Sequence, residues 1–190
     1  MKCDVILAGV GGQGVLSVSA TIAHSALREG LYVKQSEVHG MAQRGGAVMA
    51  SLRLSDEPIH SDLIPRGTAD LILSMEPLES LRYLAWLKRD GIVVTAIGPV
   101  RNIPDYPDLE TVLARIRALP RSHLIDAEAL ARRCANPKTS NVVMVGAASH
   151  LLPIRPETIA DQIRDMFAPK GESVVSDNLN AFRAGRETVH

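Results

Sequence analysis

The residues whose spacing most clearly predicts a binding site are three glycines, Gly9, Gly11 and Gly14, in the run Gly-Val-Gly-Gly-Gln-Gly. Glycines at this spacing allow a tight turn, let the backbone approach a phosphate closely, and let a following helix pack against a strand. The free N–H groups and the dipole at the start of that helix attract an anion. The same pattern also occurs in a plain strand-to-helix turn, so it predicts an anion site without identifying the ligand. The predicted cofactor-binding residues of this run are Gly9, Gly11, Gly12, Gln13 and Gly14.

A second polar, glycine-rich segment, residues 36–46, has no regular apolar period and is predicted to be a loop. Its glycines let a partner come close to the backbone, and Arg44 offers a planar fork for a carboxylate or a phosphate. Arg44 either faces the site of Gly11 or forms an interface salt bridge. Glu37, 23 positions after Gly14, either holds a ribose hydroxyl or simply begins the loop. The predicted binding residues here are Glu37, Arg44, Gly45 and Gly46.

Other common catalytic and metal-binding patterns are missing from the sequence. Val-Leu-Ser follows Gly14, so the lysine of a P-loop is absent and a nucleoside triphosphatase is disfavoured. No serine lies in a nucleophile elbow, and no histidines and acids have metal-ligand spacing. Two cysteines are too few for an iron–sulfur cluster or a disulfide framework. The histidines expected to be structural or solvated are His24, His60 and His123, and the two cysteines are Cys3 and Cys134.

The elements that must position these residues alternate between strands and helices. Several strands are apolar throughout, which is typical of a parallel sheet covered on both faces. We therefore predict an α/β fold with a doubly wound, mostly parallel, Rossmann-like sheet and helices on both faces. The predicted strands are 5–8, 31–37, 47–54, 70–74, 91–97 and 122–126, and the predicted helices are 15–30, 77–86, 108–119, 127–134, 140–152, 156–167 and 174–186.

Length and composition limit the class of protein. The 190 residues are predicted to form one domain, 1–190. Lys plus Arg and Asp plus Glu number 21 each, and aromatic residues make up 3%, so neither the charge nor the stacking surface of a nucleic-acid-binding protein is present. No apolar run approaches a membrane span, and the first residues have strand character rather than that of a signal peptide. We expect a soluble cytoplasmic protein with no membrane or nucleic-acid partner.

Two motifs together resemble a known family: Gly-Val-Gly-Gly-Gln-Gly-Val at 9–15 and Ser-Glu-Val-His-Gly-Met-Ala-Gln-Arg-Gly-Gly at 36–46. They look like those of the β subunit of indolepyruvate:ferredoxin oxidoreductase, the counterpart of the γ domain of 2-oxoacid:ferredoxin oxidoreductases. The segments 70–73 and 76–82 resemble the same family, so the resemblance spans essentially the whole chain. The loop is shorter in the broader γ family, and the extra His-Gly-Met-Ala-Gln at 39–43 points to the arylpyruvate branch.

The resemblance implies oxidative decarboxylation of an aryl 2-oxoacid to an acyl-CoA, with electrons passed to ferredoxin. Thiamine diphosphate and iron–sulfur clusters then belong to a larger α subunit, because this chain lacks a Gly-Asp-Gly…Asn pattern and enough cysteines. The chain would hold no cofactor alone and contain no catalytic residue. Its glycine loop and Arg44 would either contact the CoA diphosphate or only shape the interface over the partner's active site.

Two alternatives also fit the glycine motif. A free-standing NAD(P)-dependent dehydrogenase would use the same fingerprint, although the sequence lacks an obvious catalytic dyad and a clear substrate domain. A non-enzymatic module that senses a nucleotide or another anion is the second. A dehydrogenase would reduce a nicotinamide cofactor alone, whereas a subunit is inert until its large partner is added.

Overall fold

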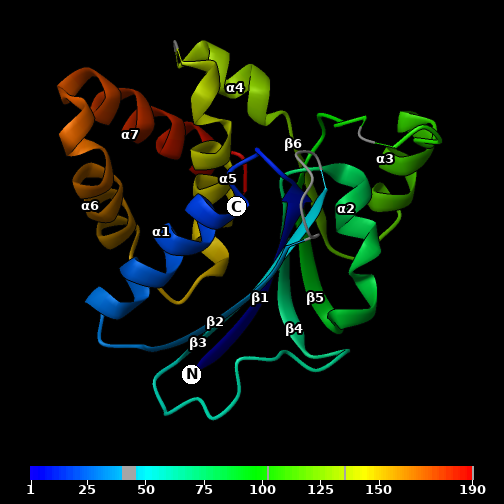
Figure 1. Cartoon of the computed structure of the whole chain (residues 1–190), viewed down its shortest axis with the longest axis horizontal. Helices are drawn as coiled ribbons and strands as arrows, with labels where there is room; N and C mark the ends of the chain where they lie inside the picture. Colours follow the sequence, from blue (N-terminus) through cyan, green and yellow to red (C-terminus); the bar gives the residue numbers. More distant parts are fainter. Residues whose placement is uncertain (40–45, 102, 135, 190) are drawn as a thin grey trace.

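A mixed β-sheet forms the centre of the fold. The computed structural model describes residues 1–39, 46–101, 103–134 and 136–189, and within them six strands pair in the order β2-β3-β1-β4-β5-β6 (Figure 1). The pairs β1–β4, β4–β5 and β5–β6 are parallel, whereas β3 runs antiparallel to both β1 and β2. The predicted α/β fold with a mostly parallel sheet is therefore confirmed. The strands are β1 (Lys2–Val10), β2 (Tyr32–His39), β3 (Ala47–Ser55), β4 (Ala69–Ser74), β5 (Leu87–Ala96) and β6 (Ser122–Ile125).

Helices cover both faces of this sheet, as predicted. The helices α1, α4, α5, α6 and α7 lie on one side, and α2 and α3 lie on the other (Figure 1). None of the helices in the described part of the chain has the length and apolar character needed to span a lipid bilayer. The helices are α1 (Val15–Arg28), α2 (Pro77–Arg82), α3 (Leu109–Arg117), α4 (Ala127–Arg133), α5 (Ser140–Ala148), α6 (Pro156–Phe167) and α7 (Glu172–Arg186).

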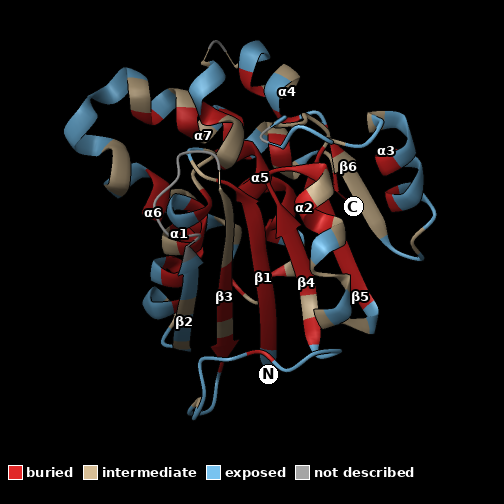
Figure 2. Ribbon diagram, turned by 45° about the vertical axis from the view of Figure 1, so that its right-hand side comes forward, coloured by how far each residue is buried: buried red, intermediate tan, exposed pale blue. Residues whose placement is uncertain are grey.

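The two apolar cores explain why the central strands are apolar at successive positions. Val5 and Leu7 of β1 pack into the core under α1 and α4–α7, whereas Ile6 packs into the core under α2 and α3. Side chains alternate between the faces of a strand, so a strand covered on both faces needs apolar residues at every position. Figure 2 shows the result: β1 and its neighbours are buried, whereas β2 at the edge is largely exposed.

Three strands, β1, β2 and β5, extend well beyond the apolar runs that predict them, and β1 does so by three residues at its start and two at its end. β2 includes Val38 and His39, which the sequence assigned to a loop, because they pair with β3. The predicted start of β5 at Gly91 is wrong by four residues, since the strand begins at Leu87. The first residues of β5 include the charged side chains of Lys88, Arg89 and Asp90. Lys88 Nζ lies 2.7 Å from Asp70 Oδ1. Backbone pairing rather than hydrophobicity determines these strand ends.

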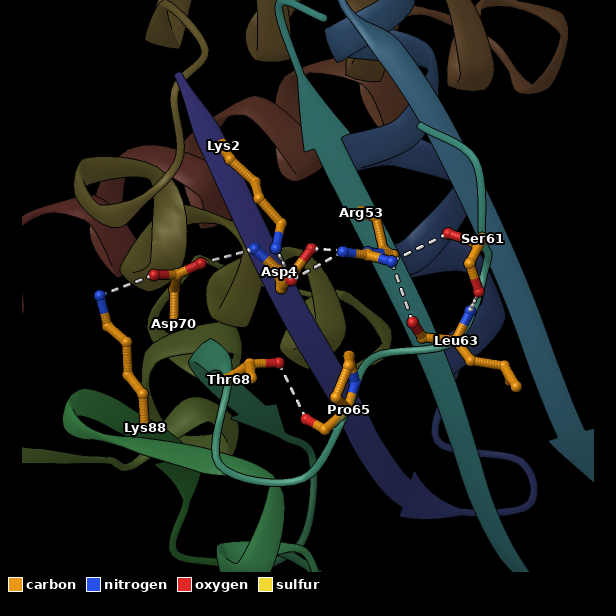
Figure 3. Close-up of polar contacts among 9 residues, drawn as sticks. All are labelled: Lys2, Asp4, Arg53, Ser61, Leu63, Pro65, Thr68, Asp70 and Lys88. Carbon is orange, nitrogen blue, oxygen red and sulfur yellow. Dashed lines mark hydrogen bonds and ion pairs between the residues drawn. The ribbon is translucent and has the colours of Figure 1, made fainter. Parts of the chain in front are cut away.

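A buried ion pair fixes the end of the sheet opposite the glycine turn (Figure 3). The Asp4 side chain is 0% exposed, and its carboxylate accepts hydrogen bonds from Arg53 Nε at 2.9 Å and Nη2 at 3.3 Å. Lys2 Nζ lies 2.8 Å from the same carboxylate. Arg53 Nη1 also donates to the carbonyls of Ser61 and Leu63, each at 3.0 Å. Because these groups satisfy one another, the cluster is a structural anchor for the chain between β3 and β4.

The helices α5 and α7 are in direct backbone contact. A Cβ added at Gly185 of α7 would lie 1.9 Å from the carbonyl oxygen of Val143 in α5. A Cβ added at Gly146 of α5 would lie 2.1 Å from the carbonyl oxygen of Phe182 in α7. Both distances are far shorter than any non-bonded contact between carbon and oxygen, so only glycine allows the two helices to cross here.

Ser19 in α1 lowers the free energy of unfolding of this protein. Its side chain is buried, and its hydroxyl has no hydrogen-bond partner among the described residues. An unsatisfied buried hydroxyl costs free energy, and alanine forms helix more readily than serine. We expect Ser19→Ala to raise the free energy of unfolding by about 1 kcal/mol, measured by urea denaturation. Ser17→Ala, at an exposed position of α1, is the control for helix propensity alone; a destabilised Ser19→Ala would contradict this account.

Candidate functional site

The glycine run forms the predicted turn between β1 and α1. Gly12 and Gly14 have φ angles of 100° and 80°, in the left-handed region that favours glycine. Gly14 is the N-cap residue of α1, so no side chain caps this helix, and the first turn contains no acidic residue. The start of α1 therefore keeps the backbone donors and the positive end of the dipole that suit an anion.

Gln13 and Gly9 have structural contacts within the turn. Gln13 Oε1 accepts a hydrogen bond from the Val10 N–H at 2.8 Å, and its Nε2 donates to the Met75 carbonyl at 2.8 Å. A Cβ at Gly9 would lie 2.8 Å from Cγ2 of Val15 and 3.1 Å from Cβ of Met75. These two residues therefore join the turn to α1 and to the end of β4, and their contact with a cofactor stays a prediction.

The structure brings part of the second motif to the glycine turn. The Gly11 N–H donates to the Gly46 carbonyl at 2.9 Å, immediately before β3 begins beside the end of β1. Gly11 and Gly46 are thus neighbours although they are 35 positions apart in the sequence. Two other predicted site residues, Arg44 and Gly45, lie outside the described residues.

Glu37 is farther from the turn. It lies in β2, pairs with Ala50 of β3, and accepts a hydrogen bond from Gln35 Nε2. Since β3 separates β2 from β1, Glu37 is two strands, or roughly 10 Å, from the glycine strand. In a dinucleotide-binding fold the strand carrying the ribose-binding acid is next to the glycine strand. The strand order here differs, and the ribose-binding role of Glu37 stays a prediction.

Two hollows flank the turn. The first, with a volume of about 320 Å³, is lined by the glycine turn together with Leu16 and Val48, and its described lining contains no charged side chain. The second, of about 260 Å³, lies between the turn and the loops that follow β4 and β5, and Gly12 borders both. Ligands of open α/β sheets bind at this edge, outside the carboxyl ends of the strands.

Glu76, the first residue of the segment 76–82 in the family resemblance, is the main residue whose functional role sequence reasoning missed. It follows β4, is 1% exposed, and caps α2 by accepting a hydrogen bond from the Glu79 N–H at 2.9 Å. Its other oxygen accepts from the Val100 N–H at 3.3 Å and from the Tyr106 hydroxyl. Burial, and then this hydrogen bond, raise the pKa of Tyr106. The sequence signals were an acid directly before Pro77 and the place of Glu76 in the segment 76–82 that resembles the family.

The histidines and cysteines do not form a metal site in the described residues. No group of three His, Cys, Asp or Glu side chains there is arranged to hold a metal ion. Cys3 is buried in β1, and burial, followed by the charges of Asp70 and Asp4, raises its pKa to about 12. Cys134 ends α4, far along the chain. His24 and His60 are exposed, and His123 is half-buried, with a pKa lowered first by burial.

Comparisons with known proteins agree over nearly the whole chain. Residues 4–188 match the family model described as pyruvate ferredoxin/flavodoxin oxidoreductase. The chain is 36% identical over 192 residues to the indolepyruvate oxidoreductase subunit IorB of Pyrococcus horikoshii, a match that covers 96% of this chain and 93% of that protein.

Two solved structures have the same fold. The pyruvate oxidoreductase subunit PORC of Thermotoga maritima superposes with a TM-score of 0.77 and 26% identity, covering 100% of this chain and 97% of that one. The 2-oxoglutarate:ferredoxin oxidoreductase of Magnetococcus marinus, with 2-oxoglutarate, coenzyme A and succinyl-CoA bound, gives a TM-score of 0.79 at 25% identity. That match covers 98% of this chain but 31% of the longer polypeptide. This chain therefore corresponds to about a third of that protein.

Proposed function

This chain belongs to the pyruvate ferredoxin/flavodoxin oxidoreductase family, and from that premise we propose that it is the small subunit of an indolepyruvate or other arylpyruvate:ferredoxin oxidoreductase. The complex decarboxylates the 2-oxoacid, joins the acyl group to CoA, releases carbon dioxide and passes two electrons to ferredoxin. The observation that carries the proposal is the near full-length similarity to an indolepyruvate oxidoreductase subunit. The extra residues 39–43 of the second motif support the arylpyruvate branch.

We assign thiamine diphosphate and the iron–sulfur clusters to a larger α subunit. Cys3 is buried at the start of β1 and Cys134 ends α4, so the two thiols do not form part of a shared ligand set. A cluster needs four protein ligands, and the described residues offer no such group. In this proposal the small subunit contributes binding and positioning, while the partner supplies the redox chemistry.

The glycine turn is the part of this chain that we propose contacts CoA. Its hollow is lined by backbone and apolar groups beside the uncapped start of α1, which suits the negative diphosphate. Arg44 precedes Gly46 by two residues, and two residues of chain span at most about 7 Å. A guanidinium beside a helix start would bind a diphosphate through charge-assisted hydrogen bonds. Gly45 and Gly46 would let the backbone come close to the same group.

The alternatives are less well supported. A free-standing dehydrogenase would need the ribose-binding acid on the strand beside β1, but β3 occupies that place.

We also propose the cytoplasm as the location, because both cysteines are free thiols and such a compartment keeps thiols reduced.

The proposal is tested by expressing the chain with and without its large subunit and measuring oxoacid-dependent dye reduction. We expect neither single subunit to be active, and the complex to reduce the dye only when an arylpyruvate and CoA are both supplied. Pyruvate and 2-oxoglutarate are the control substrates and should react more slowly than indolepyruvate. Reduction of a nicotinamide cofactor by this chain alone, or full activity of the large subunit without it, would refute the proposal.

A further inference from the structure

The connection between β5 and α3 runs along the same edge of the sheet as the glycine turn. We call its described residues, 98–101 and 103–108, the strap. The strap is irregular and contains three prolines, Pro99, Pro104 and Pro107, so no backbone ladder holds it in place. Its position must therefore come from other contacts.

Glu76 supplies two of these contacts. Its carboxylate is buried at the end of β4, where one oxygen caps α2 and the other accepts hydrogen bonds from the strap. The strap donors are the Val100 N–H, at 3.3 Å, and the Tyr106 hydroxyl. A carboxylate that loses water is stable only when donors replace the water. The buried Glu76 therefore favours the conformation in which both strap donors reach it.

The strap in turn forms one wall of the second hollow, of about 260 Å³. Gly98 and Val100 line it from the strap, and Gly12 and Gln13 line it from the glycine turn. The Val100 N–H is one of the groups held by Glu76, so the same contact that fixes the strap also fixes this wall. A displaced strap would change the width of the hollow beside the turn.

The lining suggests which part of a ligand enters the hollow. Among the described lining residues, Gln13 and Asn141 carry amide groups, Met75 and Met144 carry thioethers, and the only ionisable side chain is the exposed carboxylate of Glu128. A phosphate would be repelled by Glu128, whereas an uncharged chain containing amides would be matched by amide and apolar groups. The pantetheine arm of CoA has this chemistry.

We propose that Glu76 and Tyr106 are positioning residues that latch the strap as a wall of this hollow and thereby set the affinity for the uncharged arm of CoA. The inference rests on the proposed function, which provides CoA as the ligand. It also gives a role to the Glu-Pro-Leu-Glu-Ser-Leu-Arg motif, whose first residue is the buried carboxylate.

Limited trypsin digestion of the full chain tests the latch without any ligand. The side chain of Arg101 is exposed in the strap, 6.0 Å from the centre of the Tyr106 ring. Tyr106→Phe keeps that ring and removes only the hydroxyl that donates to Glu76. We expect cleavage after Arg101 to become up to roughly tenfold faster, because a hydrogen bond to a carboxylate no longer opposes opening of the strap.

A matched control is available in Tyr83, which is half-buried and whose ring packs edge-on against Trp86. Tyr83→Phe should be cleaved after Arg101 at the wild-type rate. Glu76→Gln should resemble Tyr106→Phe, because one amide oxygen cannot replace two carboxylate oxygens. Wild-type cleavage rates in both latch variants would overturn the latch.

Steady-state kinetics of the reconstituted complex test the positioning role. Apparent affinity falls in proportion to the fraction of molecules in which the strap is latched, so the KM for CoA should rise by the factor by which Tyr106→Phe lowers that fraction, about twofold where half of the variant molecules are open. The kcat and the KM for the oxoacid should change little. Cleavage fast enough to show that about half of the variant molecules are open, together with an unchanged KM for CoA, would overturn the positioning role while leaving the small-subunit function intact. A wild-type complex without CoA-dependent activity would instead refute the proposed function.

Discussion

Gly185→Ala should lower the free energy of unfolding by about 3 kcal/mol or more, as expected for severe overpacking in a core. The new methyl group would lie 1.9 Å from the Val143 carbonyl oxygen, so α5 and α7 would have to separate. In an ordinary helix interior the same change stabilises, because alanine forms helix more readily than glycine by about 1 kcal/mol. The sign of the effect, read from urea denaturation, therefore tests the backbone contact.

The control for this prediction is Ser176→Ala, at an exposed position of α7, which should be neutral or slightly stabilising. Gly146→Ala, on the opposing helix, should be destabilising to a similar degree because its Cβ would approach the Phe182 carbonyl. The two variants act on one contact, so the double variant should lose less stability than the sum of the single losses. A Gly185→Ala protein as stable as the wild type would show that the helices do not touch here.

The sequence predicted the central strands and the layers well because both depend on local apolar character. Successive apolar residues in β1 and β4 indicated strands buried on two faces, and the structure confirms two cores. The order of the strands could not be predicted in the same way. The antiparallel insertion of β3 between β1 and β2 depends on pairing between distant residues, such as Val10 with Ala47, which no local pattern encodes.

The candidate site was partly predictable, because one part of it depends on local sequence and the other on contacts between distant residues. The left-handed conformations of Gly12 and Gly14 follow from glycine spacing within one turn. The contact between Gly11 and Gly46 was expected only in outline, since loops at one edge of a sheet share a crevice. The role of Glu76 depends on donors 24 and 30 residues later in the chain, so its burial and its contact with the strap could not be seen in the sequence.

Arg44→Ala should raise the KM for CoA by roughly ten- to a hundred-fold in the reconstituted complex, because one charge-assisted contact contributes about 1.5–3 kcal/mol. The KM for the oxoacid should remain nearly unchanged, since the oxoacid reacts in the partner subunit. Arg44→Lys should restore only part of the affinity, because lysine lacks the planar fork that holds two phosphate oxygens. Arg89→Ala removes an exposed arginine from β5 and should leave both constants unchanged.

The alternative role of Arg44, an interface salt bridge, makes a different prediction for the same variant. If the guanidinium joins the two subunits, Arg44→Ala should dissociate the complex on a sizing column, and the constants for CoA and the oxoacid should both worsen. The ligand role instead requires an intact complex with a selective effect on CoA. The contact between Gly11 and Gly46, at the uncapped start of α1, favours the ligand role because an anion there would meet the positive end of the helix dipole, and Arg44 is only two positions from Gly46 in the sequence. An Arg44→Ala complex that assembles normally and depends on CoA as the wild type does would exclude both roles.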